Sequence, residues 1–289
     1  MIVVEHELTA PWQGVLMEPA AGSGAGVVVL AGSSGRVDRR RARLLAEQGL
    51  LALAVRWFGG PGQPAGICEV PLETFVAAVD LLESRGAERV GMFGWSKGAE
   101  AALLTAVHEP RVRALVAVSP TSLVWCNLGP GLDGRERPYR SCWTWQGRPL
   151  PFVPMNESWQ PAEQDGPVAV RGSYELSERT FARQLDAAAI PVEKASAEVL
   201  LVAGGDDEMW PSLRYAEQLA ARRRAAGLPV HLVAREDAGH RPSFPGEGPA
   251  APSEAFRYGG TDRSDALLGE AAWAPALGLL HGGLRLPPA

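Results

Sequence analysis

Ser96 lies at the centre of the pentapeptide Gly94-Trp95-Ser96-Lys97-Gly98, a G-x-S-x-G pattern. The apolar run 89–93 precedes it and the helix-compatible stretch 99–107 follows it, which is the strand, turn and helix context of a nucleophile elbow. Glycines fit the crowded turn of such an elbow, and the serine hydroxyl is then held at a helix N-terminus, where an oxyanion is stabilised. The plain alternative is a serine that caps a helix after a glycine-rich turn. The context favours Ser96 as the nucleophile of an acyl-transfer reaction.

A serine nucleophile needs a base that takes its proton and a carboxylate that orients the base. In a fold with this elbow the three residues follow the chain order serine, acid, histidine. Elimination favours His240, which lies in a loop after a late predicted strand. The other four histidines are less suitable. His6 precedes the core, and His108 ends the helix after Ser96, roughly 18 Å from it. His231 falls inside a predicted strand, and His281 lies at the C-terminus.

Two adjacent carboxylates, Asp206 and Asp207, follow the strand predicted at 198–203. Asp207 is the favoured acid because it stands four residues before Pro211, and Asp206 is then a turn former or a cap. Asp237, which comes shortly before the histidine, is the weaker competitor. The sequence therefore predicts a catalytic set of Ser96, Asp207 and His240.

The oxyanion hole of such an enzyme uses two backbone N–H groups, one from the residue after the nucleophile and one from the loop after an early strand. These positions correspond to Lys97 and to Ser33, with Ser34 in reserve. Residues 121–191 form a long irregular segment rich in Trp, Pro, Gly and Arg, which is typical of a lid or binding loop. The aromatic residues of this segment either contact substrate or anchor the segment to the core. The candidates for substrate contact are Ser34, Trp95, Trp125, Trp143 and Trp210.

Strands and helices alternate along most of the chain, which predicts a mostly parallel sheet with helices on both faces. Together with the elbow this indicates an α/β-hydrolase fold in one domain, 1–289, with 121–191 as a lid-like insertion after the sixth strand. Strands are predicted at 2–8, 14–18, 27–30, 51–55, 89–93, 114–118, 198–203 and 230–234. Helices are predicted at 37–48, 72–84, 212–226 and within 266–280, besides the one after Ser96. Within 121–191 clear periodicity returns only at 178–189.

The net charge of −5 argues against nucleic acid and anionic membranes as partners. No apolar run approaches membrane-spanning length, and the N-terminus has no basic segment of the kind that opens a signal peptide. The three cysteines lack metal-ligand spacing, so we expect a reducing, cytoplasmic setting with no metal and no bound cofactor. The expected partner is a small-molecule substrate, and the oligomeric state is left open.

The segment 94–100, Gly-Trp-Ser-Lys-Gly-Ala-Glu, resembles the nucleophile segment of acyl-CoA thioesterases and bile acid-CoA:amino acid N-acyltransferases. The Lys-Gly-Ala-Glu end is much more specific than a bare G-x-S-x-G. Further similar segments follow in order and spread the resemblance over roughly residues 25–285, at 41–59, 190–195, 205–212 and 238–240.

The resemblance implies an α/β-hydrolase fold, chemistry on acyl thioesters and the same three catalytic residues. Family members with serine as nucleophile hydrolyse acyl-CoA, whereas those with cysteine can transfer the acyl group to an amino acid, so Ser96 favours hydrolysis. The alternatives are an esterase similar to dienelactone hydrolases, an acyltransferase or cyclase that uses the same acyl-enzyme, and a non-catalytic binding protein.

Overall fold

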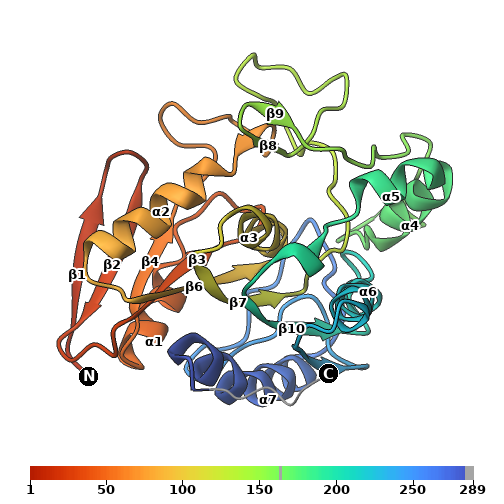
Figure 1. The fold of residues 1–289 in the computed structure, drawn as a ribbon. Coiled ribbons are helices and arrows are strands. Elements are labelled where there is room, and N and C mark those ends of the chain that lie inside the picture. Colours follow the sequence, from red (N-terminus) through yellow and green to blue (C-terminus); the bar gives the residue numbers. More distant parts are fainter. Residues whose placement is uncertain (163–164, 284–289) are drawn as a thin grey trace.

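The structure, a computed structural model, describes residues 1–162 and 165–283. Residues 163–164 of the expected insertion and 284–289 at the end of the expected domain lie outside the described residues. An eight-stranded sheet forms the centre of the fold, and only its first two strand pairs are antiparallel (Figure 1). The strands run in the order β1 (Val3–Leu8), β2 (Gly14–Pro19), β4 (Leu51–Val55), β3 (Ala25–Leu30), β6 (Arg89–Trp95), β7 (Val112–Val118), β10 (Glu198–Gly204), β11 (Val230–Arg235).

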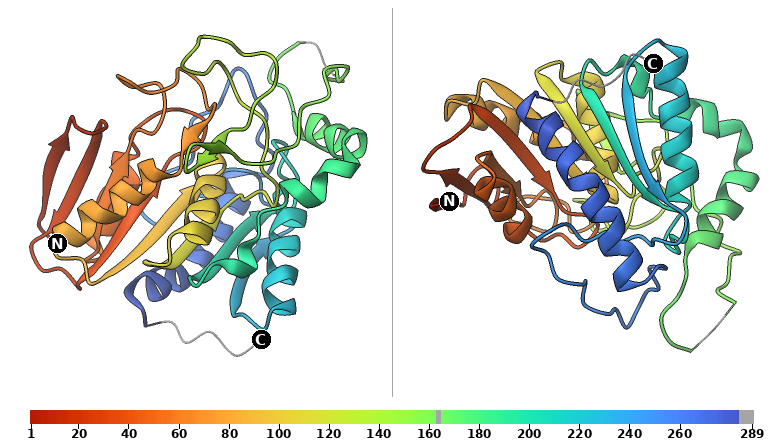
Figure 2. Two further views of the ribbon diagram at one scale, coloured as in Figure 1. Left: turned by 45° about the horizontal axis from the view of Figure 1, so that its top comes forward. Right: turned by 90° about the horizontal axis from the view of Figure 1, so that it is seen from below.

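Helices cover both faces of this sheet because its strands are apolar on both sides. In β3, for example, Val27 and Val29 pack in one core cluster, while Val28 and Leu30 pack in the other. The first cluster includes α1 (Arg39–Glu47) and α7 (Asp262–His281). The second includes α2 (Glu73–Ser84), α3 (Lys97–His108) and α6 (Ser212–Ala225). Seen from below, α7 lies in front of the strands (Figure 2).

Most predicted strands and helices occur within one or two residues of their expected bounds, but the last helix differs. The stretch 178–189, where the sequence regains periodicity, is not one helix: α4 (Arg171–Thr180) ends within it, and η1 (Ala182–Gln184) and α5 (Leu185–Ala188) follow. In α4 the hydroxyls of Ser177 and Thr180 donate to carbonyls four residues back, a pattern that weakens and bends helices. Helix α7 begins earlier than expected because Thr261 and Ser264 form a capping box.

Residues 121–191 follow β7, the sixth strand of the large sheet, as the sequence predicts. They carry β8 (Trp143–Trp145) and β9 (Arg148–Pro149), which join β5 (Val70–Pro71) in a small three-stranded sheet. They also carry α4 and α5, and η2 (Val192–Lys194) follows at once. In Figure 1 the small sheet lies above the N-terminal half of the large sheet, and α4 and α5 lie beyond its other half.

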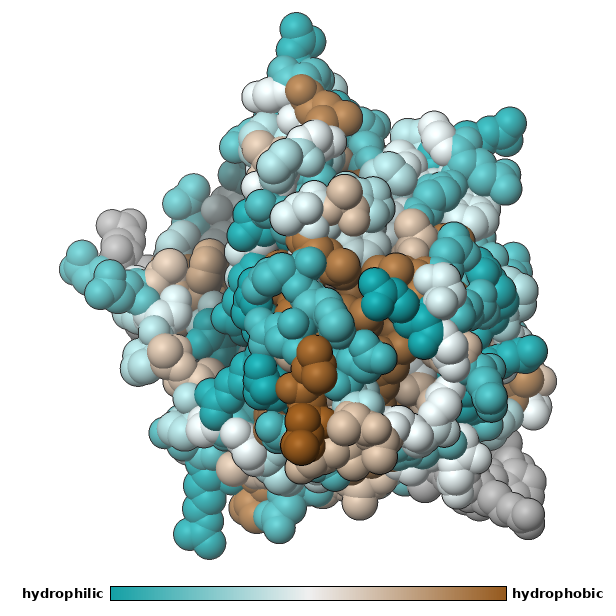
Figure 3. Space-filling model, turned by 90° about the vertical axis from the view of Figure 1, so that its left-hand side faces the viewer, coloured by the Kyte–Doolittle hydropathy of each residue, from teal (hydrophilic) through white to brown (hydrophobic). Residues whose placement is uncertain are grey.

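Strand β1 forms one edge of the large sheet, and Figure 3 shows the face on that side as mostly hydrophilic with a gathered group of hydrophobic residues. Large exposed hydrophobic residues near this edge are Met1, Ile2 and Val4. Charged side chains follow them in β1, where Glu5 and Glu7 both form ion pairs with Arg39 of α1. Charges on an edge strand discourage its pairing with other chains.

Candidate active site

Ser96 occupies the sharp turn between β6 and α3, with φ 57° and ψ −121°. This conformation is strained for a residue with a side chain, and it is held by the close packing of the two flanking glycines. A Cβ on Gly94 would lie 2.3 Å from the carbonyl oxygen of Gly98, and a Cβ on Gly98 would lie 2.5 Å from those of Leu30 and Ala31. Only glycine fits at either position, so the predicted elbow is present as local geometry.

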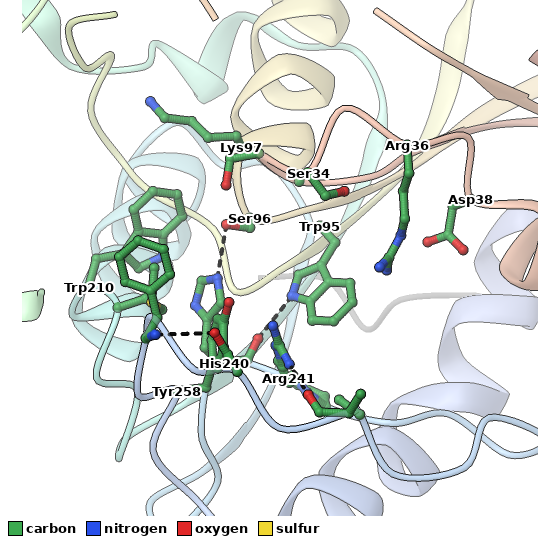
Figure 4. Close-up of a pocket in the computed structure, with 18 of the residues that line it drawn as sticks. Ser34, Arg36, Asp38, Trp95, Ser96, Lys97, Trp210, His240, Arg241 and Tyr258 are labelled. Atoms are coloured by element: carbon green, nitrogen blue, oxygen red, sulfur yellow. Dashed lines mark hydrogen bonds between the residues drawn. The ribbon is translucent and has the colours of Figure 1, made fainter. Parts of the chain in front are cut away.

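The side chains of Ser96, His240 and Asp207 form one continuous hydrogen-bonded chain. Figure 4 shows the contact between Ser96 and His240. The distance from His240 Nε2 to Ser96 Oγ is 2.9 Å, and from His240 Nδ1 to Asp207 Oδ2 it is 2.7 Å. Asp207 and His240 are 0% and 3% exposed. With Nδ1–H donating to the carboxylate and Nε2 accepting from the serine hydroxyl, every group in the chain has a partner.

Each member of this chain follows a parallel strand at the same edge of the sheet, since Ser96 comes after β6, Asp207 after β10 and His240 after β11. The second carboxylate oxygen of Asp207 accepts the N–H groups of Met209 and Trp210 at 2.8 and 3.2 Å, which fixes its orientation. These contacts leave the carboxylate oxygen Oδ2 directed at the imidazole.

The two competing carboxylates have other partners. Asp206 accepts the backbone N–H of Gly260 at 2.8 Å, and Asp237 forms an ion pair with Arg235. Of the two adjacent residues, Asp207 therefore contacts His240 and Asp206 does not. The spacing in the sequence only favoured Asp207.

The loop that carries His240 is fixed from several sides. The carbonyl oxygen of His240 accepts from Trp95 Nε1 at 2.9 Å and from Ser119 Oγ at 3.0 Å. The preceding N–H, from Gly239, donates to Asp265 Oδ1 at 2.7 Å. Burial raises the pKa of Asp265 from 3.8 to about 6. Because so many contacts fix the backbone of this loop, the position of the imidazole relative to Ser96 is set by the fold.

The loop after β3 reaches Ser96, as the sequence predicts for an oxyanion loop. A Cβ on Gly32 would lie 3.1 Å from Ser96 Cβ and 3.6 Å from its Oγ, and Ser33 and Ser34 follow directly. The backbone N–H of Lys97 opens α3 beside the nucleophile. Figure 4 shows that the side chain of Lys97 extends away from Ser96. The roles of Lys97 and Ser33 as N–H donors stay predictions.

The ammonium of Lys97 is buried against Glu100, with Nζ 2.7 Å from Oε2. The other oxygen of Glu100 accepts from Trp143 Nε1 at 2.8 Å and from the backbone N–H of Trp125 at 3.1 Å. Trp125 and Trp143 are 1% and 0% exposed and do not line the cavity described below. The structure thus differs from the expectation that they contact substrate, because their ring N–H groups bind Thr121 and Glu100 inside the core.

A cavity of about 900 Å³ opens at Ser96, and three of the predicted contact residues line it, namely Ser34, Trp95 and Trp210. Sequence reasoning did not single out most of the other lining residues. The apolar wall of the cavity includes Leu128, Met155, Trp159, Val170, Tyr174, Met209, Phe256 and Tyr258. A second group is basic and includes Arg36, Arg40 and Arg241. Only proximity in sequence to the oxyanion loop and to His240 could have pointed to the arginines.

Within residues 1–162 and 165–283, no group of three or more His, Cys, Asp or Glu side chains is arranged to hold a metal ion. In the same ranges no helix is long and apolar enough to cross a membrane. The three cysteines are buried and unpaired.

The strand order, the flanking helices and the elbow after β6 define an α/β-hydrolase fold, as expected. Solved structures with this fold are similar over nearly the whole chain. A putative dienelactone hydrolase from Klebsiella pneumoniae has a TM-score of 0.54 at 16% identity and covers 96% of this chain and 98% of its own. The 2,6-dihydroxy-pseudo-oxynicotine hydrolase has a TM-score of 0.58 at 16% identity, with 99% and 70% covered.

The chain belongs to the BAAT / acyl-CoA thioester hydrolase C-terminal family, whose model matches residues 70–285, and this confirms the resemblance found in the sequence. Human acyl-coenzyme A thioesterase 1 is 26% identical over 277 residues, which are 92% of this chain and 62% of that protein. Mouse bile acid-CoA:amino acid N-acyltransferase is 28% identical over 214 residues, with 72% and 46% covered. The chain thus matches about half to three fifths of the length of these relatives.

Proposed function

We propose that this protein is a serine hydrolase that cleaves acyl thioesters through a covalent acyl-Ser96 intermediate. The hydrogen-bonded chain from Ser96 through His240 to Asp207, open to a cavity of about 900 Å³, is the observation that carries the proposal. Its relatives by sequence include acyl-coenzyme A thioesterases, which supports a thioester as the bond that is cleaved.

In the first half of the reaction Ser96 Oγ attacks the thioester carbonyl carbon while His240 Nε2 takes the hydroxyl proton. Asp207 holds the imidazole in the tautomer that can accept this proton and stabilises the imidazolium that forms. The tetrahedral intermediate then collapses, the C–S bond breaks, and the proton passes from His240 to the departing thiolate. In the second half a water molecule loses its proton to His240 and attacks the acyl-serine, which releases the carboxylic acid and restores the serine.

The negative charge on the tetrahedral oxygen is bound, in this proposal, by the backbone N–H groups of Lys97 and Ser33. Removing one such donor typically raises the barrier by about 3 kcal/mol. The position of Gly32 against Ser96 supports the second donor, because it brings the loop after β3 within contact of the nucleophile. The N-terminus of α3 adds a favourable dipole at the same place.

We further propose that residues 121–191 act as a lid-like insertion within a single domain, and that the apolar wall of the cavity receives the acyl chain. The support for this is that Met155, Trp159 and Tyr174, all from this segment, line the cavity. Trp210 lies beside the imidazole with ring centroids 5.5 Å apart and continues the same wall. The cytoplasmic setting expected from the sequence stays a prediction.

A second candidate function is acyl transfer, in which an amine or alcohol replaces water on the acyl-serine. The observation that favours it is the similarity to N-acyltransferases at 25–28% identity. Hydrolysis remains our proposal because the family resemblance associates serine, rather than cysteine, with attack by water. If added amines accelerate loss of the acyl group and appear in the product, transfer replaces hydrolysis.

The test is Ser96→Ala with release of free thiol from a panel of acyl thioesters as the assay. Loss of the nucleophile is expected to lower kcat/KM by about 10⁴-fold or more while the fold, followed by circular dichroism, is kept. The matched control is Ser84→Ala, since Ser84 is exposed at the end of α2 and does not line the cavity. Turnover retained by Ser96→Ala refutes the nucleophile, and a matched oxygen ester cleaved faster than its thioester refutes the thioesterase assignment.

A further inference from the structure

Part of the cavity wall is rich in arginine, although the chain as a whole carries a net charge of −5. The charged side chains of this wall come from two segments that lie far apart in the sequence. They are Arg36, Asp38, Arg39, Arg40 and Arg41 before and in the first turn of α1, and Arg241 and Glu247 after β11. Five cations face two carboxylates, so the question is which of the arginines are already paired.

Two of the five arginines have carboxylate partners. Arg41 is buried between Asp38 and Glu247, to which it donates at 3.2 Å and at 2.8 and 3.0 Å. Arg39 pairs with Glu5 and Glu7 of β1, on the outer side of α1. These two guanidinium groups are therefore committed to the fold, and both lining carboxylates are held by Arg41.

The other three arginines have no carboxylate partner among the described residues. Arg36 is exposed and has no hydrogen bond or ion pair in that part of the chain. Arg40 donates only to the carbonyl of Gly246. Arg241 donates to the carbonyl of Ala251 and lies over the Tyr258 ring at 3.3 Å from its centroid. A guanidinium has five N–H donors, so each of the three retains donors for an anion.

These three arginines line the same cavity as Ser96. Arg241 follows His240 directly in the chain. Arg36 is four residues beyond Gly32, so the Cα atoms of Arg36 and Gly32 are at most about 14 Å apart. In Figure 4 Trp210 lies on one side of Ser96, and Trp95 and Arg36 lie on the other. A substrate whose carbonyl reaches Ser96 can therefore place an apolar group on the Trp210 side and an anionic group on the arginine side.

We propose that Arg36, Arg40 and Arg241 form an anion subsite that binds the phosphate groups of a thiol carrier, coenzyme A or a phosphopantetheine group. The inference rests on the proposed thioesterase function and adds the place where the leaving thiol is held. Arginine suits this task because its planar fork binds two phosphate oxygens at once and it stays charged at any working pH. The residues named above as the apolar wall, where the acyl chain is proposed to bind, carry no positive charge.

The test compares one acyl group on three thiols: coenzyme A, 4′-phosphopantetheine and N-acetylcysteamine, which lacks phosphate. The double variant Arg36→Gln/Arg40→Gln is expected to raise KM for the coenzyme A thioester by about 10-fold with kcat unchanged, because charged hydrogen bonds in the bound state are lost. Turnover of the N-acetylcysteamine thioester should not change. Arg39→Gln is the matched control, because its guanidinium is paired with β1.

The phosphopantetheine thioester identifies which phosphates are bound. An increase in its KM equal to that of the coenzyme A thioester supports binding of the phosphate on the pantetheine arm, and an increase only for coenzyme A supports binding of the nucleotide phosphates. An unchanged KM for the coenzyme A thioester overturns the subsite. An equal loss on N-acetylcysteamine thioester also overturns it, since the arginines then act on the part of the substrate that has no phosphate.

Binding of free coenzyme A to Ser96→Ala, measured by calorimetry, separates this inference from the proposed function. Binding that is weakened about 10-fold by Arg36→Gln/Arg40→Gln and by added salt supports the subsite without any turnover. If the wild type cleaves none of the thioesters while this binding persists, the hydrolase proposal fails and the subsite stands. If thioesters are cleaved but coenzyme A binding does not depend on the arginines, the subsite fails and the hydrolase proposal stands.

Discussion

Lys97 offers the sharpest test of the structural reasoning, because it follows the proposed nucleophile Ser96 while its side chain is buried in an ion pair away from it. Lys97 Nζ lies 2.7 Å from Glu100 Oε2, and the two side chains are 1% and 0% exposed. Burial by itself lowers the pKa of Lys97, but the nearby Cys142 and Glu100 raise it by more, so the net shift is upward and the lysine stays charged. The substitution Lys97→Met keeps the length of the side chain and removes its charge.

The expected loss of stability follows from what Lys97→Met leaves behind. Glu100 Oε1 still accepts from Trp143 and Trp125, but Oε2 loses its cation in a fully buried place. Breaking a buried ion pair in this way costs about 3–5 kcal/mol of the free energy of unfolding. Adding Glu100→Gln removes the unpaired charge and keeps an amide oxygen for the two tryptophans, so the double variant should lie within about 2 kcal/mol of the wild type.

The assay is urea unfolding of the wild type, both single variants and the double variant, which together give the coupling between the two sites. The kcat/KM of folded Lys97→Met toward a thioester should stay close to that of the wild type, since the proposed role of Lys97 in the reaction uses its backbone N–H and not its side chain. A loss of stability under about 1 kcal/mol, or one that Glu100→Gln does not relieve, refutes the buried pair. A collapse of kcat with unchanged stability refutes the structural reading of the ammonium.

Two further predictions concern the carboxylates around His240. Asp207→Asn should lower kcat by about 10⁴-fold with little change in fold, because its amide N–H₂ favours the wrong imidazole tautomer; steady-state kinetics checks this, and near-normal turnover contradicts the role of Asp207. Burial raises the pKa of Asp265 from 3.8 to about 6, so its ionisation costs the native state about 3 kcal/mol. The contribution of Asp265 to stability is therefore full below about pH 4 and is lost as the pH rises from about 4 through 6. Asp265→Asn should remove this fall while still accepting from Gly239, and urea unfolding at pH 4, 5, 6 and 7 checks it; an unaltered pH profile shows that Asp265 is not its source.

Local features of the sequence predicted most of the fold. Short continuous apolar runs predicted the inner strands of the large sheet, because a strand buried on both faces is apolar at nearly every position. Alternation of apolar and polar residues predicted the edge strand β1. The elbow was also readable, since the contacts that require Gly94 and Gly98 arise within one strand, turn and helix. The helix α4 was not predicted, and the periodicity at 178–189 does not show where hydroxyl side chains interrupt a helix.

Sequence order and loop position were enough to name Ser96, His240 and Asp207, but only the tertiary structure decided their contacts. The consecutive residues Asp206 and Asp207 point in different directions. Asp206 accepts from the backbone N–H of Gly260, and Asp207 binds the imidazole of His240. The same limit explains the tryptophans, since an aromatic residue is equally suited to a core and to a cavity wall. Trp143 lies in the core, where its ring N–H donates to the buried carboxylate of Glu100 in α3. Glu100 is 43 residues before Trp143 in the chain, so the local sequence around Trp143 does not show this acceptor.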